Sequence, residues 1–509
     1  MCVDFVGVIL SCVDISPLTP VIVGVGQVTD RPGPNATFAR RPQPLDLMVS
    51  ALEQASIDAG ARRPLLDTID EVIAIGSFTW HTNDPALLVA QRLGITDVTT
   101  RLTPTGGNLP QKLVHESARR ISSGDVVTVA IVGSEAMGAY SLARKEGHEV
   151  DWLVQSDDVA KPPLVEEDRI PFTKDEYDQG LTLPVEVYPL FENARRARLG
   201  WSLDTQRQRL ATLWGNFAQV AASNPFAWMS APPSPEVIVT PSATNRMVAF
   251  PYTKFLVANL PVDMGAALIM TSYEHARALG VSRDLMIFPQ CGADANDHWF
   301  VSERPQLDDS PAMRAIWDTL GGFGVDEQDL RFIDLYSCFP TVVQTACEVL
   351  GIDAFDATRV PTLTGGLTFA GGPGNNYVTH SIAAMVSALR ESPDDSGLVS
   401  ALGWFSTKHS WGTYAATPPA HGFQWRSAQR EVDDQPRCTT SSADGPVTIE
   451  TYTVSHDRSG EARQLIAAAR TNDATRVWCH SNDVALMRRA ESEEIIGLAG
   501  EVRAGLLSF

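Results

Sequence analysis

The sequence is poor in basic residues, and this shortage limits the partners the protein can have. There are 40 Lys and Arg against 61 Asp and Glu, which gives a formal net charge of −21 and a pI near 4.9. A surface this acidic repels phosphodiester backbones, so we expect no nucleic-acid partner. The charge still allows an anionic ligand held by a few local Arg, Lys and backbone N–H groups.

Cysteines are few and scattered, so the sequence offers no disulfide framework and no CxxC pair. We therefore expect no metal site and a reducing, cytoplasmic location. The seven cysteines are Cys2, Cys12, Cys291, Cys338, Cys347, Cys438 and Cys479.

Long apolar runs are also absent. None approaches the roughly 20 residues that cross a bilayer, so we expect no membrane span. The apolar stretch 5–13 follows Asp4 and has no basic segment before it, which argues against a secretory signal. We interpret residues 1–18 as an N-terminal extension.

Short apolar strands alternate with helical patterns along two long stretches of the chain. This alternation is typical of a largely parallel sheet with helices on both faces. The first stretch predicts strands at 19–28, 69–78 and 125–137 and helices at 45–60 and 110–123. The second predicts strands at 262–272, 332–339 and 398–404 and helices at 311–320 and 341–350.

Two segments interrupt this alternation. Residues 146–250 carry charge clusters, many prolines and one clear helix near 203–222, and we interpret them as a loop domain. Residues 417–444 are rich in Pro, Ser, Thr and Asp, like a linker. Residues 445–509 then show short strands and turns, which predict a small, mainly-β barrel.

Four segments, in the expected order, resemble the thiolase superfamily. The likeness is nearest to the thiolases linked to sterol carrier proteins and is also acetyl-CoA acetyltransferase-like. The resemblance implies an α/β thiolase fold of two similar halves in five layers, with a loop domain between them. The segments are ISSGDVVTVAIVGSEAM (121–137), NLPVDMGAALIMTSYEHARALG (259–280), DLYSCFP (334–340) and LTGGLTFAGGPGNNYVTHSIAAM (363–385).

The resemblance also implies a division of the chain. Residues 19–145 and 251–280 correspond to the N-terminal half, and residues 281–416 to the C-terminal half. The loop domain takes 146–250, and the β barrel is an addition to the family pattern.

The catalytic residues that the resemblance implies are missing from the sequence. Thiolases use a cysteine thiolate at a helix N-terminus, an activating histidine and a second cysteine. The nucleophile position falls near Gly106, Gly107 or Asn108, the histidine position on Gly372, and the second cysteine near Gly403. We therefore predict that the thiolase Cys/His set is lacking.

Two tyrosines are the remaining catalytic candidates. Tyr336 and Tyr377 lie near positions where thiolase-like aldolases carry tyrosines. His380 follows Tyr377 by three residues. A phenol can donate a proton to a developing alkoxide, or accept one if its pKa is lowered. The alternative is that Tyr377 packs the start of a helix and His380 is a satisfied histidine. Cys338 matches a family cysteine that is not the nucleophile, and we expect it to be buried core.

Polar residues near the expected pocket are candidates for ligand binding. The segment 406–411 follows a predicted strand, so its side chains could meet a thioester carbonyl or a phosphate; the alternative is a solvated turn. Asn376 precedes a helix and either caps it or binds a ligand carbonyl. The substrate-binding candidates are Asn108, Cys338, Asn376, Lys408 and His409.

These patterns predict a thiolase-like protein of acyl-CoA or lipid metabolism that binds an acyl-CoA thioester and has no covalently bound cofactor. Three alternatives stay open: an acetyl-CoA C-acyltransferase, a retro-aldolase on β-hydroxyacyl-CoA that uses the two tyrosines, and a non-catalytic scaffold. The resembling aldolases work with a partner protein, so a protein partner is also an expectation. The chain is either a monomer or a dimer, and the barrel could cover the surface on which thiolases dimerise.

Overall fold

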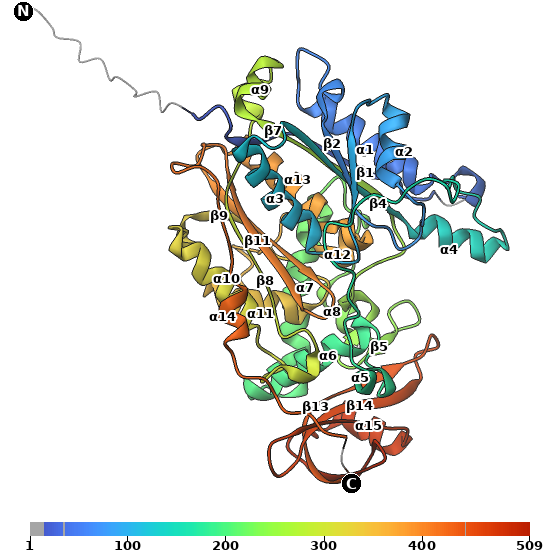
Figure 1. Cartoon of the computed structure of the whole chain (residues 1–509). Helices are drawn as coiled ribbons and strands as arrows, with labels where there is room; N and C mark the ends of the chain where they lie inside the picture. Colours follow the sequence, from blue (N-terminus) through green and yellow to red (C-terminus); the bar gives the residue numbers. More distant parts are fainter. Residues whose placement is uncertain (1–14, 34–35, 443) are drawn as a thin grey trace, which may run out of the picture.

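The computed structural model describes residues 15–33, 36–442 and 444–509 (Figure 1). Cys2, Cys12 and the first 14 residues of the expected N-terminal extension lie outside these described residues. Three β-sheets organise the described chain. No helix within it is both long and apolar enough to cross a membrane.

The first sheet belongs to the N-terminal half and has the order β1-β7-β4-β2-β3. Strand β2 runs parallel to β3 and β4, whereas β7 is antiparallel to β1 and β4. Strands β4 and β7 are buried along their whole length, as continuous apolar runs in a covered sheet require. The strands are β1 (Pro20–Thr29), β2 (Glu71–Ala74), β3 (Thr99–Leu102), β4 (Thr128–Ala136) and β7 (Asp263–Ser272).

The second sheet repeats this plan with the order β12-β8-β11-β10-β9. Four strands of each sheet correspond in order and direction, because β2-β4-β7-β1 matches β9-β10-β11-β8. The predicted pair of similar α/β halves is therefore confirmed. The strands are β8 (Phe288–Asn296), β9 (Leu330–Asp334), β10 (Ser396–Gly403), β11 (Lys408–Ala415) and β12 (Gln424–Ser427).

Helices separate and cover the two sheets. Helices α3 (Leu109–Ser123) and α13 (Tyr377–Glu391) contact strands of both sheets and form the central layer. Helices α1 (Pro44–Asp58) and α2 (Pro85–Leu93) cover the outer face of the first sheet, and α10 (Pro311–Gly322) covers that of the second (Figure 1). The result is the five-layered arrangement that the resemblance implied.

The remaining helices lie at the periphery or in the connections. Helix α11 packs against α6, α7 and α10. These remaining helices are α4 (Met137–Glu146), α5 (Lys174–Asp178), α6 (Pro184–Arg198), α7 (Leu203–Ser223), α8 (Pro235–Val239), α9 (Tyr273–Ala278), α11 (Pro340–Leu350), α12 (Gly366–Phe369), α14 (Gln429–Asp433) and α15 (Val484–Ser492).

The segment 146–250 contains more helix than its sequence indicated. The expected helix near 203–222 is present as α7, but α6 was missed. Its sequence has one proline at the start and another, Pro189, inside the helix, which costs a backbone hydrogen bond. Burial of α6 against α11 and the C-terminal barrel offsets that loss, and periodicity alone does not reveal such packing.

The segment 406–411 is not a solvated turn leading into a linker. Residues from Lys408 onward form β11, which lies in the interior of the second sheet and is buried throughout. Beyond it, β12 and α14 fall inside the stretch 417–444 and extend the same sheet next to β8. The pairing of β12 with β8 gives the stretch 417–444 backbone partners that its composition did not predict.

A closed five-stranded barrel follows, as predicted for the C-terminal module. Its strands pair in the order β13-β14-β15-β17-β16, and β16 returns to β13. With α15 between the third and fourth strands, this is the plan of an OB-type barrel. The strands are β13 (Gly445–His456), β14 (Ala462–Arg470), β15 (Arg476–Ser481), β16 (Ala499–Arg503) and β17 (Leu506–Ser508), and β5 (Met247–Ala249) and β6 (Tyr252–Thr253) extend the sheet beyond β13.

The barrel docks through the face of its second and third strands, which OB-folds commonly use for ligands. Arg476, Trp478 and His480 alternate along β15 and all bond to the body of the protein. The Trp478 indole N–H donates to Ser302 Oγ at 2.8 Å, and the Arg476 guanidinium donates to the Ser302 carbonyl at 3.0 Å. This face is therefore occupied by the chain itself.

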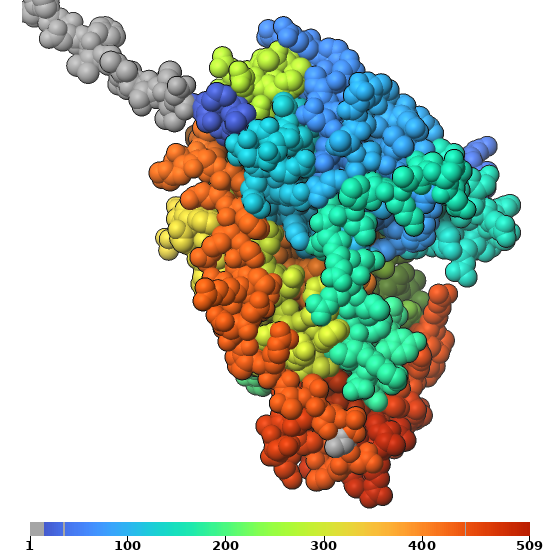
Figure 2. Space-filling model, viewed as in Figure 1, coloured from blue at the N-terminus to red at the C-terminus, as the bar shows by residue number. Residues whose placement is uncertain are grey.

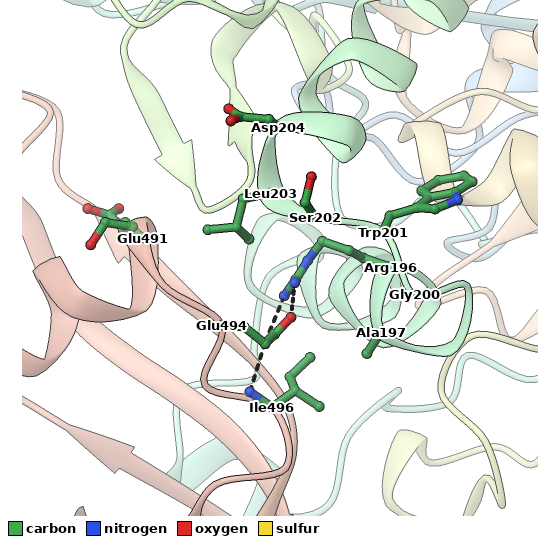
Figure 3. Close-up of a pocket in the computed structure, with 11 residues that line it drawn as sticks. Arg196, Ala197, Gly200, Trp201, Ser202, Leu203, Asp204, Glu491, Glu494 and Ile496 are labelled. Atoms are coloured by element: carbon green, nitrogen blue, oxygen red, sulfur yellow. Dashed lines mark hydrogen bonds and ion pairs between the residues drawn. The ribbon is translucent and has the colours of Figure 1, made fainter.

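A cleft of about 830 Å³ runs along the junction of the barrel with the turn between α6 and α7. Figure 3 shows that the Arg196 guanidinium bonds to the Glu494 carboxylate, which also accepts the Ile496 backbone N–H. The Arg196 side chain is fully buried. Glu494 already balances the charge of Arg196, and this ion pair joins the barrel to the turn between α6 and α7.

We expect Arg476→Met to destabilise the protein by about 3–5 kcal/mol, because it removes one partner of a buried ion pair. The wild-type guanidinium holds Glu450 at 2.7 Å and 2.8 Å and also satisfies backbone carbonyls. Urea unfolding followed by tryptophan fluorescence measures the change. Arg503→Met is the control, since Arg503 is 77% exposed and pairs with Glu501; its effect should stay within about 1 kcal/mol. Equal effects of the two substitutions would contradict the docking role.

Candidate functional site

The N-terminal end of α3 meets the C-terminal half at a set of residues that we call the α3 mouth: Gly106, Gly107 and Asn108 on one side, and Tyr336, Gly403 and Lys408 on the other. The two sides approach each other closely at Gly107. A Cβ atom there would lie 2.5 Å from Tyr336 Oη and 2.6 Å from the Leu402 carbonyl oxygen. The space for a side chain at the expected nucleophile position is thus already filled.

The position expected for the second cysteine is filled as well. A Cβ atom on Gly403 would lie 2.6 Å from Asn108 Oδ1 and 3.0 Å from Lys408 Cε. The same two side chains crowd Gly106, where a Cβ atom would lie 2.4 Å from Lys408 Nζ. Asn108 and Lys408 therefore occupy the volume between the glycines.

The position expected for the histidine, Gly372, is not filled by neighbouring atoms. A Cβ atom on Gly372 would make only ordinary contacts, the nearest 3.4 Å away at the Asn259 carbonyl oxygen. Room for a side chain thus remains at the expected histidine position, although the sequence does not use it.

Several polar groups at the α3 mouth lack a partner within the described chain. The Asn108 side chain is buried, and its Oδ1 has no hydrogen-bond donor. The backbone N–H groups of Gly107 and Asn108 likewise make no hydrogen bond to another described residue. Free N–H groups at a helix N-terminus favour a negatively polarised oxygen.

Two consecutive asparagines hold α13 in place. The Gly106 N–H donates to Asn375 Oδ1 at 2.9 Å, and the Asn375 amide donates to the Gly76 carbonyl at 2.7 Å. The Asn376 amide donates to the Gly133 carbonyl at 2.7 Å and makes no side-chain cap to its helix. Asn376 therefore links α13 to β4, and its amide is committed to the backbone.

Tyr336 and Tyr377 are brought together. Their ring centroids are 5.6 Å apart, edge to face. The Tyr377 hydroxyl is hydrogen-bonded to Thr364 Oγ1 at 2.6 Å, whereas that of Tyr336 points toward Gly107. Burial raises the pKa of both phenols above the usual value, so both stay protonated at neutral pH. They are suited to donating a hydrogen bond and not to accepting a proton.

His380 points away from Tyr336 and Tyr377, although it lies on the same helix, α13, as Tyr377. Its Nδ1 is 2.9 Å from Gln27 Oε1, which assigns the proton to Nδ1, and its buried Nε2 has no partner among the described residues. Burial lowers the pKa of His380 to about 3, so the ring is neutral at physiological pH. The expected assistance to Tyr377 is not part of this arrangement.

The described cysteines are free thiols, and none stands at the positions expected for the two catalytic cysteines. Burial raises the pKa of Cys338 to about 12 and that of Cys291 to about 11. A thiol that remains protonated is a weak nucleophile. Cys338 belongs to the hydrophobic core, as expected for a packing residue.

Lys408 does face the α3 mouth, but His409 does not. The Lys408 ammonium donates to the Thr105 carbonyl at 2.9 Å and to Glu166 Oε1 at 2.7 Å. His409 points to the opposite face of β11, where its Nε2 lies 3.3 Å from Asp297 Oδ2 and 3.1 Å from the Ser406 carbonyl. Neighbouring residues of a strand point to opposite faces, so only one of them reaches the mouth.

Glu166 and Lys112 complete the charged part of the site, and the sequence analysis missed both. Glu166 bridges Lys408 and Lys112 through its two oxygens. Burial raises the pKa of the Glu166 carboxyl, but the two ammonium groups outweigh this effect and hold it below the usual value. The sequence signal was the acidic cluster 166–168, which resembles an ordinary solvated charge run. Across the described residues, no cluster of His, Cys, Asp and Glu could hold a metal ion.

A family model described as the additional C-terminal domain of thiolase-like protein type 1 matches residues 427–505. Over 97% of its length the chain is similar to the crystal structure of a monomeric SCP2-thiolase-like protein type 1 from Mycobacterium smegmatis. That match covers 99% of the other chain, with 32% identity and a TM-score of 0.82. Comparison with curated protein sequences finds no match.

Two more distant structures share the fold alone. One is described as an Ltp2-ChsH2(DUF35) aldolase, with 17% identity over 79% of this chain and 98% of that one and a TM-score of 0.59. The other is the dimeric peroxisomal thiolase of Saccharomyces cerevisiae, with 15% identity over 79% and 98% and a TM-score of 0.55.

We expect Gly107→Ala to destabilise the protein by about 1–3 kcal/mol, because its methyl group overpacks the α3 mouth. The cost should fall but persist in a Tyr336→Phe background, since the Leu402 carbonyl still blocks the methyl. Gly321→Ala is the control: that glycine lies in α10 with open space around it, so we expect a gain of up to about 1 kcal/mol. Chemical denaturation measures all three. An unchanged free energy of unfolding for Gly107→Ala would show that the mouth is open.

Proposed function

The chain belongs to the family of type 1 SCP2-thiolase-like proteins, and we propose that it binds an acyl thioester of coenzyme A without catalysing thiolysis or Claisen condensation. The observation that carries this proposal is the α3 mouth. Tyr336 and the Leu402 carbonyl fill the space beside Gly107, while unpartnered polar groups remain around Asn108.

The proposal of lost thiolysis follows from the reaction's need for a nucleophile that can ionise. Glycines stand at positions 107, 372 and 403. The buried thiols Cys338 and Cys291 have raised pKa values. Because nucleophilic acylation by cysteine requires the thiolate, neither is a substitute. These features weigh against the acetyl-CoA C-acyltransferase alternative.

The proposal of retained binding rests on the polar groups that the mouth still presents. Two N–H groups at the start of α3 suit a thioester carbonyl oxygen. Lys408 and Lys112 supply positive charge in a protein whose formal net charge is −21. Such local cations are what a phosphorylated ligand needs to approach an acidic surface.

A retro-aldolase is the second candidate, favoured by the edge-to-face pair Tyr336 and Tyr377. Their raised pKa values support hydrogen-bond donation to a developing alkoxide, but they oppose proton abstraction, which retro-aldol cleavage also requires. This alternative therefore needs a base other than the two tyrosines. The scaffold alternative becomes the favoured one if no thioester binds.

Calorimetric titration with CoA and with octanoyl-CoA tests the proposal. We expect saturable binding of octanoyl-CoA, no acetyl transfer from acetoacetyl-CoA, and a roughly 10- to 100-fold weaker Kd for Lys408→Met, because a hydrogen bond to a charged group is lost. Lys174→Met is the matched control, since Lys174 lies exposed on α5. Absence of heat or competition with both ligands would leave only the scaffold role.

We also propose that the protein is a monomer. The relative with 32% identity is described as monomeric. In this chain the outer edge of β3 is covered, because the Leu102 N–H donates to the Pro163 carbonyl at 3.2 Å and the Val165 N–H donates to the Leu102 carbonyl at 3.0 Å. A covered edge cannot pair with a second copy. The barrel lies at the other end of the molecule (Figure 1).

Light scattering after size exclusion should therefore give a mass near 55.2 kDa, independent of concentration. Val165→Pro removes the N–H that covers β3 and should promote association, whereas Val154→Pro, in the same connection, should not. A wild-type mass twice as large would refute the monomer.

A further inference from the structure

Residues 147–173, which we call the strap, form the first part of the loop domain and lead from α4 to α5 without a helix, and only residue 164 forms a β-bridge. Figure 2 shows the strap (teal to green) over the face where the two halves meet. It is attached at both ends. The Trp80 indole N–H donates to the Leu153 carbonyl at 2.8 Å, and the Trp299 indole N–H donates to the Ile170 carbonyl at 2.8 Å.

Between these attachments, one strap side chain reaches the α3 mouth. Glu166 places one carboxylate oxygen on Lys408 and the other on Lys112. The Lys408 side chain is only 4% exposed and Glu166 17%. The next residue, Glu167, is exposed and makes no ion pair among the described residues. The contact therefore belongs to one position of the acidic cluster.

The lysines and the carboxylate lie beside groups that still lack partners. Lys408 Nζ and Asn108 Oδ1 both crowd the same point beside Gly106. Asn108 is 3% exposed, and its Oδ1 accepts no hydrogen bond in the described chain. A buried amide oxygen without a donor is unfavourable, so a resting state of this kind favours a ligand that supplies one.

We propose that Glu166 is a built-in substitute for the anionic group of a ligand, and that the strap closes an anion-binding site formed by Lys408 and Lys112. A carboxylate or phosphate group of the ligand displaces Glu166 and takes its two ammonium contacts, while an N–H or O–H group of the same ligand donates to Asn108 Oδ1. This inference rests on the proposed function, because the strap and Glu166 would regulate access to the same α3 mouth.

The chemistry of the two lysines sets the ligand class. Two ammonium groups on one carboxylate form a site for a compact anion with at least two acceptor oxygens, which a carboxylate or a phosphate provides. A free anion can bind only to molecules in which Glu166 has left the two lysines. The apparent affinity is therefore reduced to the intrinsic affinity multiplied by the fraction of such open molecules. Neutralising Glu166 should remove that reduction.

Full-length wild type, Glu166→Gln and Glu167→Gln are titrated with inorganic phosphate by calorimetry. We expect Glu166→Gln to bind phosphate at least tenfold more tightly than wild type, Glu167→Gln to match wild type, and Glu166→Gln with Lys408→Met to lose the gain. Thermal unfolding confirms that each variant is folded. Equal phosphate affinity of Glu166→Gln and wild type overturns the proposal.

A second measurement needs only the wild-type chain. Trypsin can cut the strap after Arg169, and phosphate that displaces Glu166 should speed cleavage at this site. Chloride at equal ionic strength is the control. A cleavage rate that phosphate leaves unchanged or slows counts against displacement of the strap.

Octanoyl-CoA separates this inference from the proposed function. If Glu166→Gln gains phosphate binding but neither it nor wild type binds octanoyl-CoA, the closed anion site stands and thioester binding fails. If both bind octanoyl-CoA with the same Kd, thioester binding stands and closure by Glu166 fails.

Discussion

The burial of α3 and α13 between two sheets is the constraint on which the rest of the structure depends. Polar groups on these helices have little water to bond with, so each finds a partner in the protein or remains unpaired at a cost. Asn375 and Asn376 meet this requirement by bonding to backbone groups of the first half and of the α3 mouth. His380 meets it by remaining neutral and bonding to Gln27.

The same constraint explains why glycine occupies the α3 mouth. At Gly107 and Gly403 the two halves approach so closely that a Cβ atom would overlap with a tyrosine hydroxyl, a carbonyl or an amide oxygen. The family fold is thus kept with a central contact closed by Tyr336, Asn108 and Lys408. The groups that face one another there offer charge and hydrogen bonding.

The C-terminal barrel and the strap place further limits on the site. The barrel uses the face of β14 and β15 to bond to the body, and Arg476 and Glu450 neutralise each other at that junction. Strand β5 of the loop domain and β6 just after it also extend the sheet that contains β13. Because Glu166 lies on the connection that leads into this assembly, the charge state of the mouth is tied to the position of the strap.

The sequence alone was enough to predict the fold, and it shows glycines at the positions where the resemblance implies catalytic residues. Continuous apolar strands such as β4 and β7 alternate with amphipathic helices, and glycines stand at positions 107, 372 and 403. Such local patterns are legible because strand and helix periodicities are properties of the chain itself. Helix α6 and strand β11 were misjudged because tertiary burial overrode a proline in one and a polar composition in the other.

Only the tertiary structure decided which polar residues act together. Glu166, Lys112 and Lys408 are far apart in the chain, and nothing in an acidic cluster identifies which carboxylate is buried. His380 is three residues from Tyr377 and yet faces Gln27, while Tyr336 reaches Gly107 from the opposite half. These contacts depend on how two sheets pack around two helices, and that packing brings together residues whose separation in sequence carries no signal.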